Sequence, residues 1–257
     1  MTYIYTHGFR SSTNSQTHRR LCDGVGIAPL QLCYENGGIF MDNLLSLSAQ
    51  LQAKLLERDS YNPSLSASPT SHASHALPAP FASPLDSENS ESSPPTSELS
   101  KSRSQRNSKS RPCSESRSLL HAPFDFISHS LGAFYLWQLT LFAPALSLPR
   151  PRRLILFNPV FEPLTQLQGY IDKPQPNYTT NTPFILSQKA WESYAKARLD
   201  EGVGEVELLV YLARGDERIN HKLSRPYWEK YGRVTDYHGG HSVQDFSPFR
   251  SEILEEA

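Results

Sequence analysis

Short apolar runs alternate with longer segments of helical periodicity along most of this chain. The runs are rich in β-branched and aromatic residues and predict strands at 2–6, 28–34, 123–128, 152–158 and 205–214. Apolar positions near helical spacing predict helices at 41–58, 131–143 and 219–232, then a short strand-like run at 233–238 and a closing helix from about Pro248. This alternation predicts an α/β fold, with a mostly parallel central sheet of about five to six strands and helices on both faces.

Two segments of different composition interrupt this alternation. Residues 59–118 are dominated by Ser, Pro, Asn and charged residues, with too few apolar side chains to offset the entropy lost on ordering. We therefore predict one domain formed by 1–58 and 119–257, with a long disordered Ser/Pro-rich insertion at 59–118. Residues 160–200 are instead rich in aromatic side chains, which suits a cap-like segment over a site within the domain.

Composition and charge narrow the range of partners. The chain has 257 residues, 38% of them hydrophobic, which is enough for one sizeable core and does not require a second domain. Its formal net charge is -1, so we expect neither nucleic acid nor an anionic membrane as a partner of the whole molecule. The end of the insertion is basic and serine-rich; it could be phosphorylated or bind RNA, although a solvated tether is the simpler interpretation.

The three cysteines do not form a disulfide or zinc pattern. Cys22, Cys33 and Cys113 are an odd set without a C-x-x-C pair, which favours a reducing compartment and a cytoplasmic location. The chain opens with a strand-like run and not with a signal peptide, so we do not expect secretion. Residues 126–149 carry no charge and could span a bilayer, but internal polar residues and Pro144 favour a buried helix.

A serine at the predicted junction of the third strand and its helix is the candidate nucleophile. In "SHSLG", Ser130 lies two residues from Ser128 and two from Gly132, so the pentapeptide is a G-x-S-x-G turn with its first glycine replaced by serine. Such a turn exposes the hydroxyl and points the amide of Leu131 toward a developing oxyanion. A serine that caps a buried helix would have a similar local sequence, so the pentapeptide alone leaves both interpretations open.

Two more residues follow later strands in an order typical of hydrolases with this architecture. Asp216 follows the fifth strand in "LARGDERIN", and His241 lies in "YHGGHSVQDF" after the last short strand. His241 would take the proton of Ser130, and Asp216 would orient the imidazole. Asp216 could instead cap the next helix, and His238 is an alternative base; we prefer His241 because two glycines directly before it allow a flexible approach.

The loop after the first strand is a candidate for the other half of an oxyanion hole. In "THGF", Phe9 would lend its backbone amide, while His7 and Gly8 would let the backbone approach the substrate. A tight turn without function would have the same sequence. We interpret His7 as an organiser of the loop and not as a base. The other histidines lack metal-site spacing, so we expect no metal and surface or linker positions for His18, His72, His75, His121 and His221.

Five separated patches resemble the UPF0227 family of small α/β-hydrolase-fold, YqiA-like esterases. The patches are "YIYTHGFRSS", "FISHSLGAFYLWQL", "LILFNPVFEPL", "LARGDERI" and "GGHSVQDF". The resemblance implies an α/β-hydrolase fold, a Ser130, Asp216 and His241 triad, and hydrolysis of esters or thioesters without a cofactor. The family's nucleophile patch typically reads G-S-S-L-G-G; Ser128, His129 and Ala133 replace three of its residues, and Glu162 stands where relatives are expected to have arginine.

These observations lead to a first hypothesis and two alternatives. The first is a serine esterase or thioesterase that cleaves a small to medium acyl ester through an acyl-enzyme, with oxyanion donors at Phe9 and Leu131. We expect further substrate contacts from His7, Gly8, His129, Asn158, Pro159 and Phe161. One alternative is a catalytically silent hydrolase-fold protein that binds partners through its insertion. The other is a lyase or acyltransferase that uses the same three residues.

Overall fold

A computed structural model of the chain describes residues 1–61 and 122–256. The disorder predicted for the insertion therefore lies outside the described residues from position 62 onward. At its start the predicted boundary is wrong, because residues 59–61 form the last turn of helix α2 (Phe40–Tyr61). Residues on both sides of the gap belong to one unit by their mutual contacts.

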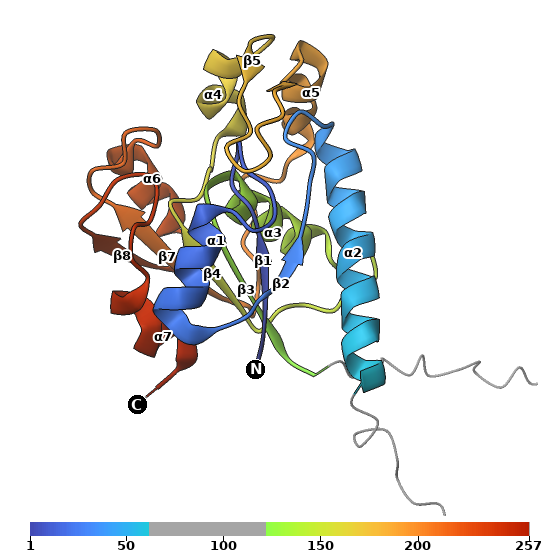
Figure 1. Cartoon of the computed structure of the whole chain (residues 1–257), viewed down its shortest axis with the longest axis vertical. Coiled ribbons are helices and arrows are strands. Elements are labelled where there is room, and N and C mark those ends of the chain that lie inside the picture. The colour runs from blue at the N-terminus through green and yellow to red at the C-terminus, as the bar shows by residue number, and fades with distance from the viewer. Residues whose placement is uncertain (62–121, 257) are drawn as a thin grey trace, which may run out of the picture. The chain divides into compact units, whose positions relative to one another are not determined.

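Six parallel strands form the central sheet, in the order β2-β1-β3-β4-β7-β8 (Figure 1). Their bounds are β1 (Thr2–Thr6), β2 (Leu30–Leu32), β3 (Phe124–His129), β4 (Arg153–Phe157), β7 (Glu207–Ala213) and β8 (Arg233–Tyr237). The predicted α/β fold and parallel sheet are confirmed. After β1 the chain forms β2 on one side of β1 and later forms β3 on the other side. The strand order therefore reverses between β1 and β3. Open parallel sheets bind ligands at the carboxyl ends of strands at such a reversal.

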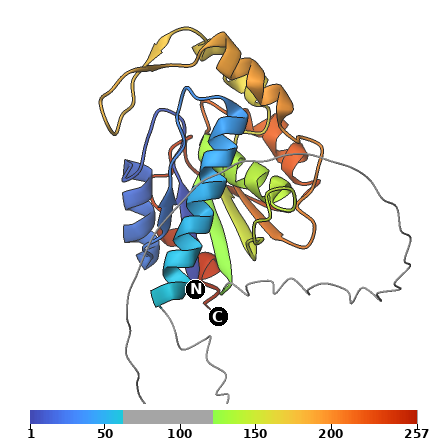
Figure 2. The same cartoon turned by 90° about the vertical axis from the view of Figure 1, so that its right-hand side faces the viewer.

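Alternate side chains of each strand pack into two cores, one on each face of the sheet. On β4, Leu154 and Leu156 belong to one core, whereas Ile155 and Phe157 belong to the other. The first core is covered by α2, α3 (Ser130–Phe142) and α6 (His221–Trp228). The second is covered by α1 (Gln16–Leu21), the turn at Cys22–Gly26 and α7 (Arg250–Leu254) (Figures 1 and 2). Helices thus cover both faces, as predicted.

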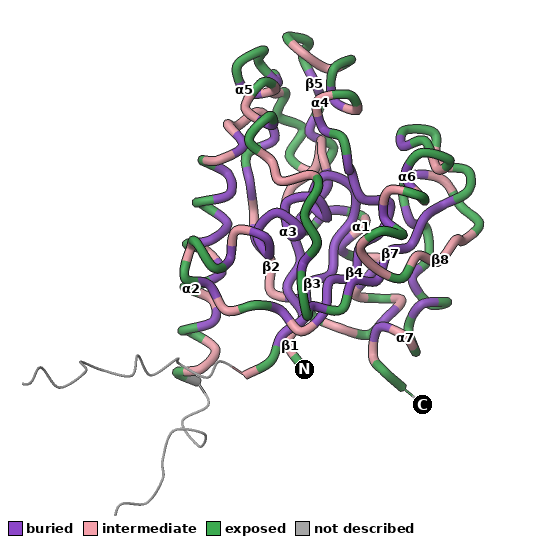
Figure 3. The backbone as a smooth tube through the Cα atoms, turned by 180° about the vertical axis from the view of Figure 1, so that it is seen from behind, coloured by how far each residue is buried: buried purple, intermediate pink, exposed green. Residues whose placement is uncertain are grey.

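Helix α3 is buried around its whole circumference. Residues 130–141 are all buried, whereas α2 alternates between buried and exposed positions (Figure 3). Trp137 of α3 packs against Trp228 of α6 at a ring distance of 4.9 Å, and Tyr135 shares a 3.0 Å hydrogen bond with Tyr194. This burial explains the long uncharged run in the sequence. In the described residues, no helix is long and apolar enough to cross a membrane.

The segment at 160–200 consists of short elements above the carboxyl edge of the sheet (Figure 1). They are α4 (Pro163–Gln166), the antiparallel pair β5 (Pro174–Gln175) and β6 (Phe184–Ile185), and α5 (Gln188–Glu192), with 3-10 turns at Gln168–Tyr170 and Ser193–Lys196. Aromatic contacts join the segment to the domain: Tyr170 and Phe184 both contact the ring of Phe9, at 5.3 and 5.4 Å. The segment therefore borders the loop after β1.

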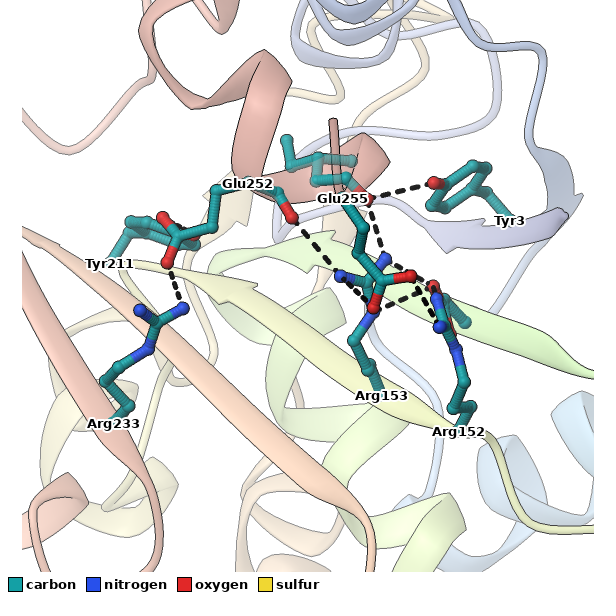
Figure 4. A network of polar contacts seen from close by, with 9 residues as sticks. Tyr3, Arg152, Arg153, Tyr211, Arg233, Glu252 and Glu255 are labelled. Carbon is teal, nitrogen blue, oxygen red and sulfur yellow. Dashed lines mark hydrogen bonds and ion pairs between the residues drawn. The ribbon is translucent and has the colours of Figure 1, made fainter. Parts of the chain in front are cut away.

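An ion-pair network joins the opposite, amino edge of the sheet to the C-terminal helix α7 (Figure 4). Asp125, at the start of β3, is fully buried and accepts hydrogen bonds from both Arg152 and Arg153. Arg153 is 2% exposed and also donates to the backbone oxygen of Ile253 at 2.6 Å. Glu255 completes the network by pairing with both arginines.

Candidate active site

Ser130 occupies a sharp turn between β3 and α3. His129 still has extended backbone angles, Ser130 has a positive φ of 59°, and α3 begins at that residue. A positive φ is uncommon for a residue other than glycine, and the surrounding structure must maintain it. The turn places the Ser130 side chain at the carboxyl edge of the sheet. It also places the amide of Leu131 in the first turn of α3, where amides lack an intrahelical partner.

Close packing of the backbone around the turn explains why small residues flank Ser130 at positions 128 and 132. A Cβ atom at Gly132 would lie 2.3 Å from the His7 oxygen and 2.7 Å from the Thr6 oxygen, so only glycine fits there. Ser128 is buried, and its hydroxyl donates a 2.6 Å hydrogen bond to the same Thr6 oxygen. The serine that replaces the first glycine is therefore accommodated by a specific hydrogen bond as well as by its small size.

Ser130, His241 and Asp216 form a continuous chain of hydrogen bonds. The Nε2 atom of His241 lies 2.9 Å from the Ser130 Oγ, and its Nδ1 lies 2.9 Å from the Asp216 Oδ2. Because a carboxylate only accepts, Nδ1 carries the hydrogen and Nε2 is free to accept from the serine. His238 is exposed, and in the described part of the chain no contact joins it to Ser130. The structure therefore brings His241, and not His238, to the serine.

The hydrogen bonds of Asp216 favour its charged form. Burial by itself raises the pKa of this carboxyl, but hydrogen bonds from His241 and from the backbone amides of Arg218 and Ile219 outweigh it and hold the pKa below its ordinary value. The neighbouring Glu217 accepts a 2.8 Å hydrogen bond from the His241 amide, which lowers the pKa of Glu217. Sequence reasoning missed Glu217, although its place beside Asp216 was a signal.

Two further side chains hold the backbone of His241. Its carbonyl oxygen accepts hydrogen bonds from the His129 Nε2 at 2.6 Å and from the Asn158 Nδ2 at 2.8 Å. Asn158 has a positive φ of 44°, and its Oδ1 accepts from the Ala213 amide at 2.7 Å. Since Ala213 ends β7, Asn158 ties the loop that carries His241 to the sheet.

Two cavities open on Ser130. The polar cavity has a volume of about 320 Å³; its lining includes Gly8, Phe9, His129, Ser130 and His241, together with Arg10, Ser11, Ser15, Gln16, Thr17, Arg19, Tyr178, Thr179, Arg218 and Ser242. The apolar cavity has a volume of about 40 Å³ and is lined by Phe9, Ser130, Val160, Gln166, Leu167, Tyr170, Arg218, Ile219 and His241. The first reaches toward α1, and the second lies against the segment at 160–200.

The cavities separate the predicted substrate contacts into two groups. Gly8 and His129 line the polar cavity, as does Phe9, the predicted oxyanion donor. A Cβ at Gly8 would lie 3.3 Å from the Cβ of Ser130. Four other predicted contact residues line neither cavity: His7, Asn158, Pro159 and Phe161. All four are buried in the fold.

Packing inside the fold explains why these four predicted substrate contacts do not line a cavity. The His7 ring stacks on Tyr34 at 4.3 Å, and the ring of Phe161 packs against Tyr227 at 4.9 Å. Asn158 has its hydrogen bonds inside the fold, and Pro159, which follows it directly, is buried. The sequence showed that these residues follow strand ends but not which way their side chains point.

Apart from His129 and His241, none of the described histidines and cysteines lines either cavity. His18, expected on the surface, is 8% exposed and packs against Tyr5, whereas His221 is partly buried and pairs with Asp236. His72, His75, His121 and Cys113 lie outside the described residues. Cys22 and Cys33 are free thiols. No group of three or more potential metal ligands occurs in the described ranges.

The sequence matches the UPF0227 family over residues 125–255, which is half of the chain and includes Ser130, Asp216 and His241. The chain belongs to this family. UPF0227 is described as an uncharacterised protein family. No curated protein matches the sequence.

Solved structures share the fold of this UPF0227 member at low sequence identity. A candidate hydrolase from Agrobacterium vitis S4 has 12% identity and a TM-score of 0.57, covering 99% of this chain and 87% of that one. Est1E from Butyrivibrio proteoclasticus with bound ferulic acid has 11% identity and a TM-score of 0.51, covering 100% and 89%. Together with the parallel sheet and the turn at Ser130, these similarities establish an α/β-hydrolase fold.

Two buried histidines should make stability depend on pH. Burial lowers the pKa of His7 to about 4, and burial together with the nearby His241 lowers the pKa of His129 to about 3. Both pKa values lie below the unfolded value of about 6.5, so their stabilising effect is complete above pH 6.5 and is lost as the pH falls toward 4. Between pH 7 and 5, each should lower the free energy of unfolding by about 2 kcal/mol.

Urea unfolding of the wild type and of His7→Asn at several pH values measures how much of the pH dependence of stability comes from His7. Between pH 7 and 5, the free energy of unfolding of the variant should fall by about 2 kcal/mol less than that of the wild type, whatever its absolute stability. Equal pH slopes for the two proteins would contradict the assignment.

Proposed function

We propose that this UPF0227 member is a serine hydrolase that cleaves a carboxylic ester or thioester with a small to medium acyl group through an acyl-enzyme. The observation that supports it best is the pair of 2.9 Å contacts joining Ser130 to His241 and His241 to Asp216. Ser130 attacks the carbonyl carbon while His241 takes its proton. Asp216 keeps the imidazole in the correct tautomer and stabilises its positive form.

The rest of the cycle follows from the same groups. The amides of Phe9 and Leu131 donate to the oxyanion, and protonated His241 returns its proton to the leaving alcohol or thiol. Water then attacks the acyl-enzyme with His241 as base, which releases the acid and restores Ser130. The apolar cavity, lined in part by Val160 and Leu167, suits the acyl portion, and none of these steps requires a metal or an organic cofactor.

Labelling with a fluorophosphonate probe tests this proposal against a catalytically silent binding protein. The folded wild type should become labelled, and Ser130→Ala should not. Failure of the wild type to label, or equal labelling of the variant, would favour the silent protein.

Product analysis with and without an added acceptor alcohol distinguishes hydrolysis from acyl transfer: the free acid should remain the main product.

Asn158 should act as a positioning residue for His241. Replacing it with alanine removes the 2.8 Å hydrogen bond to the His241 carbonyl oxygen, and the imidazole should lose its alignment with Ser130. We expect kcat to fall by about 10–100-fold with little change in KM, because displacements of about 1 Å have effects of that size. Steady-state kinetics on an acyl ester would measure this; an unchanged kcat would contradict it.

A further inference from the structure

The residues that line the polar cavity carry a net positive charge. Arg10, Arg19 and Arg218 all line it, and its other lining residues include no aspartate or glutamate. The apolar cavity on the other side of Ser130 has a volume of about 40 Å³, against about 320 Å³ for the polar one. A concave surface lined by one sign of charge concentrates ligands of the opposite charge.

The backbone holds Arg10 in a fixed and unfavourable conformation. Its φ is 63°, its amide donates to the Asn36 Oδ1 at 2.8 Å, and its carbonyl oxygen accepts from the Tyr178 amide at 2.9 Å. A positive φ at an arginine persists only where the surrounding structure enforces it, and such residues are concentrated at functional sites. Two segments distant in sequence therefore converge to place this one residue.

The Arg10 side chain is also oriented before any ligand arrives. Its guanidinium carbon lies 4.8 Å from the ring centre of Tyr178 and 5.9 Å from that of Tyr170, and its Nη2 donates to the Tyr178 hydroxyl at 2.7 Å. Aromatic contacts of this kind stabilise a guanidinium without neutralising its charge. The tyrosines thus fix the position of the charge and leave it available.

Most of the hydrogen-bonding capacity of the arginines is unused. Neither Arg10 nor Arg19 forms an ion pair with another described residue, and the Arg10 Nε has no hydrogen-bond partner although it is buried. Within the described ranges, the Arg218 side chain forms one ion pair, with its neighbour Glu217 at 3.6 Å. Guanidinium groups pair with the oxygens of carboxylates and phosphates through parallel hydrogen bonds.

We propose that the polar cavity binds an anionic group, a carboxylate or a phosphate, on the alcohol or thiol portion of the substrate. This inference rests on the proposed function, with the acyl portion in the apolar cavity and Ser130 between the two. Arg10 is the main anchor, and Arg19 and Arg218 add to the positive field. The protein would thus prefer esters whose leaving group is negatively charged.

Matched butyrate esters test this preference with the leaving group held nearly constant. The substrates are 4-(carboxymethyl)phenyl butyrate, 4-(phosphonomethyl)phenyl butyrate and the neutral methyl ester of the first. The wild type should hydrolyse at least one anionic ester with a kcat/KM about tenfold above that of the neutral ester, the effect of about one charge-assisted hydrogen bond. Whichever anion is preferred identifies carboxylate or phosphate, and added salt should reduce the preference.

Variants test whether the polar cavity causes this preference. The quantity compared is the ratio of kcat/KM for the anionic ester to kcat/KM for the neutral ester. In Arg10→Gln the anionic-to-neutral ratio should fall toward one, whereas a general loss of active-site order would lower both values together. Arg150→Gln is the matched control, because Arg150 is exposed, lines neither cavity and lies just before β4, at the amino edge. A wild-type ratio near one, or a ratio unchanged in Arg10→Gln, would overturn the proposal.

A binding measurement separates failure of this inference from failure of the proposed function. If hydrolysis depends on Ser130 but the anionic-to-neutral ratio of kcat/KM is near one, the proposed function is supported and the proposed anion site is wrong. Calorimetry on Ser130→Ala compares 4-hydroxybenzylphosphonate with its neutral dimethyl ester and needs no catalysis. Binding of the anion about tenfold more tightly would support the site even if no ester were cleaved, and equal or absent binding would overturn it.

Discussion

Replacing Ser130 with alanine should lower kcat/KM for acyl esters by about 10⁴–10⁶-fold, because the acyl-enzyme can no longer form. The fold should survive, since alanine keeps the small Cβ at a turn where the backbone is packed closely. Adding His241→Ala to this variant should cause almost no further loss, because the two residues act as one unit. Single-turnover and steady-state hydrolysis of a butyrate ester would measure both effects.

Ser128 provides the matched control for this variant. It is buried two residues from Ser130, and its hydroxyl donates to the Thr6 oxygen and not to His241. Ser128→Ala should keep activity to within about tenfold, because the small side chain that the turn needs is retained. If Ser130→Ala kept wild-type activity, or if the two variants lost activity equally, the proposed nucleophile would be wrong.

The largest effect on stability is expected from Asp125→Asn. The carboxylate is fully buried and pairs with the guanidinium of Arg153, which is 2% exposed. Asparagine removes the buried charge beside Arg153 and leaves its guanidinium only the partly exposed Glu255 as an ion-pair partner in the network. Removal of one partner of a buried ion pair costs about 3–5 kcal/mol in the free energy of unfolding. Urea unfolding at neutral pH would measure the change.

Glu201→Gln makes the same chemical change in an exposed pair. Glu201 lies 3.4 Å from Arg198, and the two side chains are 54% and 37% exposed. Exposed pairs of this kind contribute about 0.2–1 kcal/mol, so this variant should change the midpoint of unfolding very little. If the free energy of unfolding fell equally in the two variants, the burial of Asp125 would not determine the size of the effect.

The four inner strands of the sheet, β1, β3, β4 and β7, were predictable because nearly all of their residues are buried and each strand reads as a short apolar run. Helix α1 was missed because its sequence, "QTHRRL", has only Leu21 as an apolar residue. Its start depends on the Ser15 hydroxyl, which accepts from the His18 amide at 3.2 Å, and its burial depends on packing against the distant C-terminal region. Tertiary contact, and not local periodicity, therefore determines this helix.

The Ser130, Asp216 and His241 cluster was predictable because the carboxyl ends of parallel strands share one edge of the sheet. The polar cavity was not, because its wall combines the loop around Arg10 with the turn at Tyr178, segments more than 160 residues apart. Similarly, the sequence placed Asn158 at a strand end, but only coordinates show that its amide bonds to the backbone of His241.

The hydrogen bond of Ser128 has a consequence for how related enzymes are recognised. A pattern that demands glycine at both flanking positions would pass over this protein, yet the steric limit differs between the two sides. Gly132 faces two backbone oxygens and admits no larger residue, whereas position 128 admits a hydroxymethyl group that an oxygen of the neighbouring strand accommodates. Genome searches should therefore keep the second glycine strict and allow serine at the first, which would bring overlooked members into the family.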